Sequence, residues 1–221
     1  METRAVREWQ RLANEILDAS WEFMNCCSVN FDRGFIGELL TLSQLIRTYD
    51  RVLSDEGNGI SYLGSSKKNI DIQLLLEGRD IRINCKGTTI HEGQRPKWVR
   101  QHARKFCSIS LSSDGVYEIR PKEDYDPNFF YVYVDVKAWL NTHRPDFFVL
   151  SDEEVKRNFG ADYARNWNGR PARRNDSDDM WVGCSSDPNA YSYDLSDYSD
   201  NTLSRFAGCI KEPGAGICQR T

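Results

Sequence analysis

The alternation of polar and apolar residues over positions 69–87 constrains the fold of this chain more than any other feature. The sequence there is NIDIQLLLEGRDIRINCKG, and successive side chains of a β-strand point to opposite faces of a sheet. We place a tight turn at Gly78 and Arg79, which pairs residue 76 with 81, 74 with 83, 73 with 84 and 71 with 86. One face of this hairpin then carries Ile72, Leu74, Leu76, Ile81, Ile83 and Cys85.

The other face of the hairpin carries Asp71, Gln73, Asn84 and Lys86, interrupted by Leu75. In this register Asp71 lies directly opposite Lys86. A carboxylate, an amide and an ammonium group on rigid strands can hold a divalent cation and a water molecule. A half-exposed hairpin with an ordinary cross-strand ion pair has the same pattern, so the hairpin alone leaves both interpretations open.

Upstream of the hairpin, residues 31–49 have the 3.6-residue period of a helix. Glu38 falls inside the apolar stripe, between Leu45 and Tyr49 on the helical wheel. An unpaired buried carboxylate is so costly that it is usually paired, protonated or bound to a metal. We therefore expect Glu38 to face the core; the alternative is an edge position from which it reaches solvent or Arg82. The stripe consists of Phe35, Leu39, Leu42, Leu45, Ile46 and Tyr49.

These pieces together resemble the PD-(D/E)XK, or restriction-endonuclease-like, nuclease superfamily. The family's order is a helix with an inward Glu, a strand with Asp, a short turn, and a strand ending in acid-x-Lys-Gly-Thr, which Glu38, Asp71 and Lys86 follow. Residues 129–136 and 144–155 are also similar to those nucleases. The resemblance covers residues 30–160. It implies the fold class α/β, with a restriction-endonuclease-like core in which a mixed β-sheet is flanked by helices.

The chain departs from the family at its second motif acid, where it has Asn84. An amide oxygen can bind Mg²⁺ but brings no negative charge, so both the metal affinity and the electrostatic stabilisation fall. Three explanations remain open at this point. The chain can be a natural variant that works with an amide, a decayed homologue that no longer cuts, or a protein inactivated by an Asp-to-Asn change.

The resemblance implies Mg²⁺-dependent hydrolysis of DNA phosphodiester bonds, as in type II restriction or defence nucleases, with Mn²⁺ able to replace Mg²⁺. Lys86 would orient or help deprotonate the attacking water, and Gln73 would orient the ligands. Two other functions stay open: a catalytically impaired subunit that binds DNA or another protein, and a plain α/β protein with a structural polar hairpin. The metal ligands that the resemblance implies are Asp71, Asn84, the Cys85 backbone carbonyl and Glu38.

Contacts with DNA must come from local basic patches, because the chain has a net charge of −4 and a pI near 5.5. We predict a helix over 93–106 that presents a basic stripe to the phosphate backbone, and a basic surface loop that reaches DNA. The alternatives are a solvated helix face and a loop neutralised by its own aspartates. The candidate DNA-binding residues are Lys97, Arg100, Arg104, Arg170, Arg173 and Arg174.

The organisation expected is one domain, with a helical segment at 1–30 packed on a nuclease-like core at 31–160 and a loop-rich extension at 161–221. No secretory signal or long apolar run is visible, so we expect a cytoplasmic protein without membrane contact. The seven cysteines contain no CxxC pair, so we expect free thiols rather than structural zinc. A homodimer would supply the two sites that double-strand cutting needs.

Further elements are expected along the chain. We predict a helix over 4–24 with Trp9, Leu12, Ile16 and Phe23 on its apolar side. Strands are predicted within 51–63 and over 107–111, 116–119, 131–136 and 147–150. A capping box at Ser151 predicts a helix start, and a short helix is expected over 202–206.

Overall fold

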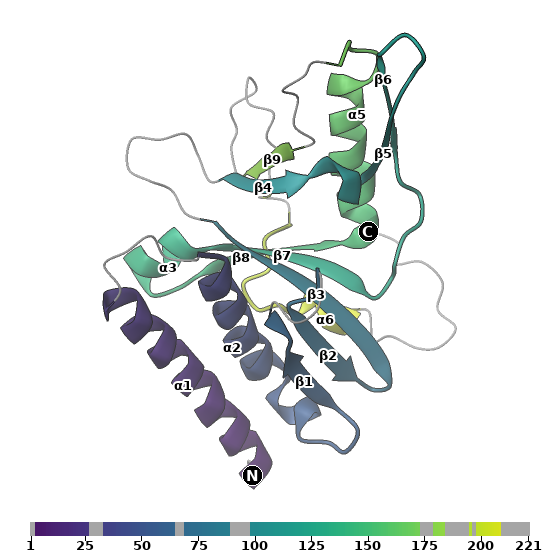
Figure 1. Ribbon diagram of the computed structural model, residues 1–221. Helices are drawn as coiled ribbons and strands as arrows, with labels where there is room; N and C mark the ends of the chain where they lie inside the picture. The colour runs from purple at the N-terminus through teal and green to yellow at the C-terminus, as the bar shows by residue number, and fades with distance from the viewer. Residues whose placement is uncertain are drawn as a thin grey trace.

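A mixed five-stranded sheet flanked by helices organises the chain (Figure 1). The computed structural model describes residues 3–26, 33–64, 69–88, 98–172, 179–183, 195 and 198–208. The sheet order is β1-β2-β3-β7-β8: β1, β2 and β3 are antiparallel neighbours, β7 runs parallel to β3, and β8 is antiparallel to β7. The expected α/β class with a mixed sheet and flanking helices is confirmed.

The elements have the following bounds. The helices are α1 (Arg4–Cys26), α2 (Arg33–Leu53), α3 (Val136–Thr142), α4 (Asp152–Glu154), α5 (Ala161–Trp167) and α6 (Arg205–Gly208), with a 3-10 turn η2 (Ala103–Lys105) and a π-helical turn η3 (Val155–Gly160). The strands are β1 (Gly59–Tyr62), β2 (Ile72–Leu76), β3 (Arg79–Thr88), β4 (Trp98–His102), β5 (Cys107–Leu111), β6 (Tyr117–Pro121), β7 (Phe129–Asp135), β8 (Asp146–Ser151) and β9 (Asp179–Gly183).

One face of the sheet packs against α2, and α1 packs on the outer side of α2 (Figure 1). The apolar hairpin face predicted from the sequence is fully buried here, together with Val132 and Val134 of β7. Helix α1 was predicted correctly, but its Leu12 and Phe23 are exposed because it buries only the side that faces α2. Within the described ranges, no helix combines the length and apolarity needed to cross a bilayer.

The opposite face of the sheet is covered by the β5–β6 hairpin and by the helical segment from η3 to α5. Tyr131 and Tyr133 of β7 point to this side, where Phe106 and Phe159 pack against them in edge-on ring contacts. The polar face of the hairpin is buried only where Asp71 and Asn84 lie, whereas Leu75 and Asp80, nearer the turn, are exposed.

Local sequence patterns predicted most of these elements. The strands β5, β6, β7 and β8 were predicted, and the Ser151–Glu154 capping box is present in both directions. The predicted strand within 51–63 is shorter than expected because α2 runs on to Leu53 and β1 begins only at Gly59. The short helix near the C-terminus begins at Arg205 rather than at residue 202.

The helix predicted over 93–106 is wrong. Residues 93–97 are outside the described ranges, and residues 98–102 form strand β4, which pairs antiparallel with β9. A 3-10 turn follows at 103–105. The partner strand supplies long-range hydrogen bonds that override the local helical pattern, so Arg100 and Arg104 do not share a helix face.

The predicted hairpin register is also wrong by two residues, although both faces are as expected. The turn residues are Glu77 and Gly78, with φ angles of 50° and 78°, and β2 pairs Ile72 with Ile83 and Leu76 with Arg79. Two successive positive φ angles define a type I′ turn, which fits the twist of two-residue hairpins. Asn58 stabilises this unusual conformation of Glu77, because its Oδ1 accepts a hydrogen bond from the Glu77 N–H at 2.7 Å.

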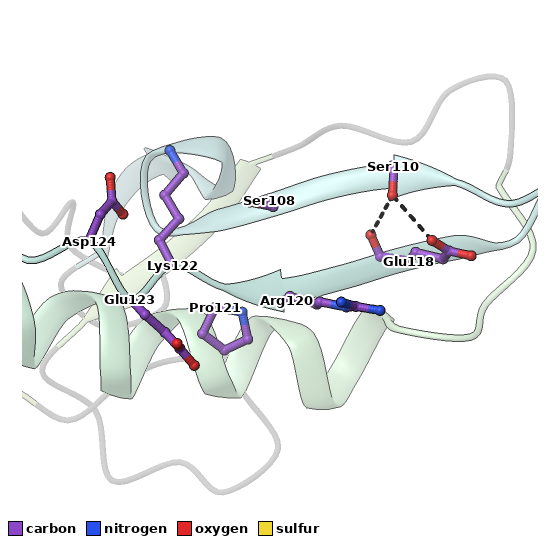
Figure 2. Close-up of a pocket in the computed structure, with 8 residues that line it drawn as sticks. All are labelled: Ser108, Ser110, Glu118, Arg120, Pro121, Lys122, Glu123 and Asp124. Atoms are coloured by element: carbon purple, nitrogen blue, oxygen red, sulfur yellow. Dashed lines mark hydrogen bonds between the residues drawn. The ribbon is translucent and has the colours of Figure 1, made fainter.

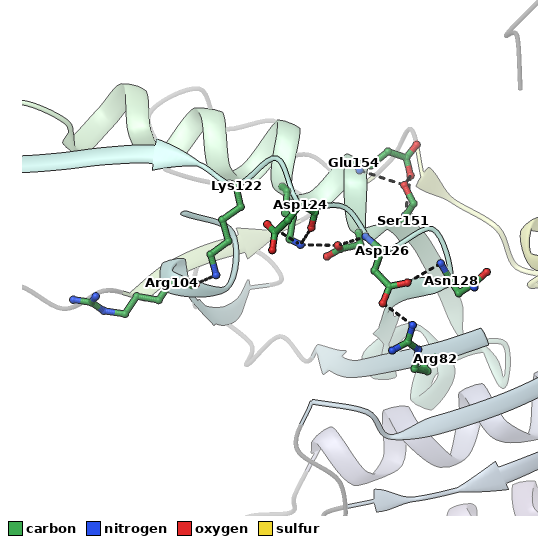
Figure 3. Close-up of polar contacts among 10 residues, drawn as sticks. Arg82, Arg104, Lys122, Asp124, Asp126, Asn128, Ser151 and Glu154 are labelled. Atoms are coloured by element: carbon green, nitrogen blue, oxygen red, sulfur yellow. Dashed lines mark hydrogen bonds and ion pairs between the residues drawn. The ribbon is translucent and has the colours of Figure 1, made fainter. Parts of the chain in front are cut away.

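A polar network fastens the loop between β6 and β7 to the sheet (Figure 3). Buried Lys156 donates from Nζ to Asp152 Oδ2 at 2.7 Å and to the Asp124 carbonyl at 2.5 Å. The same Asp152 oxygen accepts the Asp126 N–H, and the Asp126 carboxylate pairs with Arg82 of β3 at 2.7 Å. Each buried charge therefore has an oppositely charged partner, which is the condition for burying it without a large penalty.

Two glycines bring α2 and β3 into direct backbone contact. An ideal Cβ on Gly37 would lie 2.8 Å from both the Cα and the N of Gly87, closer than real Cβ atoms approach other atoms. Glu38 on the helix is thereby held close to Lys86 on the strand. A side chain at position 37 has no space unless the helix moves away from the sheet.

We predict that Gly37→Ala lowers the free energy of unfolding by about 1–3 kcal/mol, because the added methyl group meets rigid backbone. Helix propensity alone predicts the opposite sign, since alanine is favoured over glycine inside a helix by about 1 kcal/mol. Urea unfolding measures the difference. The control is Gly59→Ala in β1, where no atom lies within 4 Å of the added Cβ. An unfolding free energy for Gly37→Ala at or above the parent value would contradict the close contact.

Candidate functional site

The candidate site lies where strand β2 stops and β3 continues. The β2–β3 pairing extends to Ile72 opposite Ile83 and to the Asp71 N–H, which donates to the Ile83 carbonyl at 2.9 Å. Beyond this point β3 pairs, among the described strands, with β7 alone. The Asp71 carboxylate lies at the open edge, and its Oδ2 accepts the Cys85 N–H at 2.7 Å. Asp71 thus satisfies a strand donor that lacks a neighbouring strand.

Asn84 is the second polar group of the site, and it is almost completely buried. Its Nδ2 donates to the same Asp71 Oδ2 at 2.9 Å. Its Oδ1 is buried and has no hydrogen-bond partner among the described residues. Since an unsatisfied buried carbonyl oxygen costs about 1–3 kcal/mol, this atom marks a place where a ligand would be stabilised. The expected pairing of Asp71 with Lys86 is wrong, because the register shift places Asn84 there.

Glu38 is only half buried, so the expectation that it faces the core is wrong, and the alternative of an edge position holds. Its carboxylate has a partner that the sequence did not reveal. The Tyr62 hydroxyl, at the end of β1, donates to Glu38 Oε2 at 2.7 Å. Burial raises the pKa of Tyr62, and the hydrogen bond from its hydroxyl to Glu38 and the negative charges of Glu38 and Asp71 raise it further. The phenol therefore lies within electrostatic reach of both acids. Arg82, the alternative partner of Glu38, pairs with Asp126 instead.

Two lysines place positive charge beside Asp71. Burial raises the pKa of Asp71 above its ordinary value of 3.8, while the Cys85 N–H and the charges of Lys86 and Lys105 act in the opposite direction. Lys86 extends from β3, two residues after Asn84, and Lys105 comes from η2 in the covering layer. Because the pKa of Asp71 is raised overall, the loss of hydration outweighs the three stabilising influences on the charged form. A cation beside this carboxylate would offset that cost.

Cys85 contributes its backbone rather than its thiol. The side chain points into the apolar core on the opposite face, where it is fully buried and free. Burial raises the pKa of this thiol well above its usual value, and the Asp71 carboxylate adds to the effect. The thiol is therefore a packing group, not a nucleophile.

Gln73 lies apart from this group. It shares the polar face, but its Nε2 donates to Asp80 Oδ1 at 2.6 Å, farther along the hairpin toward the turn. Of the predicted catalytic residues, the structure brings Asp71, Asn84, Lys86 and Glu38 to one region, and it directs the Gln73 amide elsewhere.

Only three of the six predicted DNA-binding residues lie among the described residues. Lys97, Arg173 and Arg174 lie outside the described residues, and Arg100 is on β4 opposite Trp181, with its side chain not described.

The two basic side chains that can be placed are both exposed. The Arg104 guanidinium donates to the Ile109 carbonyl at 3.4 Å, and its own carbonyl accepts from Lys122 Nζ (Figure 3). Arg170 lies over the Trp167 ring at 5.4 Å. No continuous basic stripe follows from these positions.

The donor set of the site suits Mg²⁺ in part. Carboxylate and amide oxygens are suitable ligands, and the unpartnered Asn84 oxygen beside Asp71 fits such a role. The described residues contain no group of three or more His, Cys, Asp or Glu side chains placed to hold a metal ion. Asn84 in place of an acid accounts for part of this result, because an amide is not one of those residue types. The set fits a cation bound by one buried carboxylate and one amide oxygen, with Glu38 nearby.

A surface hollow of about 940 Å³ lies elsewhere, on the β5–β6 hairpin (Figure 2). Arg120 and Lys122 line it together with Glu118, Glu123 and Asp124, so opposite charges are mixed along its wall. None of the predicted site residues takes part. We assign no function to this hollow, because the candidate catalytic side chains lie elsewhere.

Comparison with known proteins gives no match. No family model matches the sequence, and neither a curated protein nor a solved structure matches the chain significantly. Function must therefore be argued from the geometry of this chain.

Sequence reasoning missed Tyr62 and Lys105 as residues of the site. Tyr62 lies two residues after Ile60 in a short strand just before the hairpin. That position could have indicated that its side chain lies beside the hairpin. Lys105 lies in the segment 93–106, for which the sequence predicts a helix and no part in the catalytic site. Lys105 comes near Asp71 because the segment 103–105 packs on the face of the sheet that carries Tyr131 and Tyr133.

We predict that Asp71→Asn changes how stability depends on pH. Because the pKa of Asp71 is raised in the folded protein, the unfolded chain releases this proton first as pH rises. The free energy of unfolding of the parent therefore falls as pH rises from 3.8 through the higher folded-state pKa. The variant lacks this loss, so its stability relative to the parent increases with pH over that interval and is constant above it.

Urea unfolding without divalent ions, from about pH 3 to pH 8, measures this difference. Asp114→Asn, which removes an exposed carboxyl from the β5–β6 turn, is the control for the loss of one carboxylate. A relative stability of Asp71→Asn that is flat or that decreases with pH would show that Asp71 is not desolvated.

Proposed function

We propose that this protein is a Mg²⁺-dependent endonuclease with a restriction-endonuclease-like core, acting on DNA in the cytoplasm. The observation that carries the proposal is the buried Asn84 Oδ1 without a partner among the described residues, beside a desolvated Asp71 carboxylate. The order of helix, three antiparallel strands and a fourth strand parallel to the third supports the family resemblance. Mn²⁺ is expected to substitute for Mg²⁺.

Each side chain of the site has a role that follows from its chemistry. Asp71 and Asn84 offer oxygen ligands, the Cys85 carbonyl is a third candidate, and Glu38 approaches from α2. A bound divalent cation supplies polarisation of the scissile phosphate and increases the acidity of water. Asp71 Oδ2 is already fixed by the Cys85 N–H, so the carboxylate is oriented before any ligand arrives.

Lys86 and Lys105 supply positive charge on the protein side of the reaction. Both lie close enough to affect the Asp71 carboxylate, and they come from different layers of the fold. Lys86 is assigned to orient the attacking water and to offset charge that develops on the phosphate. Lys105 is assigned to phosphate binding. Two active sites in a homodimer would allow both strands of a duplex to be cut.

A second candidate function is favoured by the hydrogen bond between the Asn84 amide and Asp71. The amide N–H occupies the Asp71 carboxylate oxygen that a cation would need, so the protein can retain the nuclease fold and bind DNA or another protein without cutting it. In this case a carboxylate at position 84 restores the negative charge that cation binding needs.

We predict that Asn84→Asp strengthens Mg²⁺-dependent cleavage of duplex DNA by about tenfold or more. The new carboxylate lies at hydrogen-bond distance from Asp71, and two such acids repel unless a cation lies between them. Plasmid and oligonucleotide cleavage with Mg²⁺ or Mn²⁺ measures the effect. Asn14→Asp on α1 is the matched control, because Asn14 already accepts from Arg47 and lies in another part of the fold.

The outcomes separate the two functions. Cleavage by the parent protein supports the enzyme, and cleavage by the Asn84→Asp variant alone supports the impaired subunit. If neither protein cuts DNA and neither binds DNA in a metal-dependent way, the nuclease proposal is rejected.

A further inference from the structure

Tyr62 connects β1, the edge strand of the sheet, to helix α2, which carries Glu38. Its hydroxyl donates to Glu38 Oε2 at 2.7 Å, across the interface between β1 and α2. Glu38 is only half buried, and this hydrogen bond restricts the rotamers open to its carboxylate. The bond therefore selects one orientation of this acid.

The phenol itself is held in place by its surroundings. The Phe35 ring lies 6.4 Å from the Tyr62 ring in an edge-on arrangement. On the other side, an ideal Cβ on Gly64 would lie 3.0 Å from the hydroxyl oxygen and 3.2 Å from Cζ. Gly64 also has a φ of 50°, a conformation that favours glycine. A small residue here leaves room for the tyrosine side chain.

The same three-residue segment also contacts the second acid. The N–H groups of Leu63 and Gly64 both donate to the Asp71 carbonyl, at 2.8 and 3.2 Å. Thus residues 62–64 touch Glu38 through a side chain and Asp71 through the backbone. The end of β1 therefore connects the Glu38 carboxylate to the backbone of Asp71.

We propose that Tyr62 is a positioning residue that holds the Glu38 carboxylate beside Asp71, so that both acids contribute to the binding of one divalent cation. The inference rests on the proposed cation site, but it does not require that the protein cuts DNA. It assigns to Tyr62 an effect that is exerted through Glu38 alone.

A double-mutant cycle on the full chain, without nucleic acid, tests this inference. Mn²⁺ affinity is measured by electron paramagnetic resonance for the parent, Tyr62→Phe, Glu38→Gln and the double variant. Loss of one hydrogen bond to a charged group predicts that Tyr62→Phe weakens Mn²⁺ binding by about three- to tenfold. In the Glu38→Gln background the same change should have little further effect, because the group on which Tyr62 acts is already altered.

Tyr125→Phe is the matched control, since it removes a hydroxyl from a ring that contacts Arg157 rather than the site. Thermal unfolding verifies that each variant is folded.

The outcomes distinguish this inference from the proposed function. Unchanged or tighter Mn²⁺ binding by Tyr62→Phe, or an equal loss in the parent and in the Glu38→Gln background, overturns the role of Tyr62 and leaves the nuclease proposal standing. A coupled loss in a protein that does not cut DNA supports Tyr62 and counts against the nuclease. A parent that binds no Mn²⁺ overturns both.

Discussion

The Asp71 carboxylate, immediately before the first residue of β2, makes the interactions on which the candidate site depends. One of its oxygens accepts the backbone N–H of Cys85 and the side-chain amide of Asn84, at the place where β3 loses its antiparallel neighbour. Without this acceptor an edge N–H would be left without a partner. The same two bonds orient the carboxylate, and so a structural requirement of the sheet and a proposed chemical role coincide in one residue.

The balance of charge around Asp71 bears on which of the two proposed functions the site can have. Lys86 and Lys105 lie near Asp71, Glu38 and Asp71 both lie near Tyr62, and Asn84 adds a hydrogen bond but no charge. An additional carboxylate would create a strong need for a cation. With the amide at position 84, no additional negative charge has to be compensated. One buried amide oxygen nevertheless remains without a partner among the described residues. That atom is what favours a ligand over a purely structural polar cluster.

What the sequence could predict was set by local periodicity. The two faces of the hairpin, the buried strands β7 and β8, and the Ser151 capping box depend on neighbouring residues and were predicted correctly. The hairpin register was not, because the left-handed Glu77 depends on a hydrogen bond from its N–H to Asn58, outside the hairpin. The local sequence predicts a helix in place of strand β4 because the partner strand β9 lies far along the chain. Tyr62 was missed for the same kind of reason: its contact with Glu38 arises only when β1 and α2 pack together.

Crystals soaked in Mn²⁺ and examined by anomalous diffraction test the central claim most directly. The account predicts an anomalous peak in contact with the Asp71 carboxylate and Asn84 Oδ1, with Glu38 on the same side. The contradicting result is an absence of any peak there, with Asn84 Oδ1 accepting a hydrogen bond from a lysine or from ordered water. The polar face of the hairpin would then be a structural feature of the sheet edge.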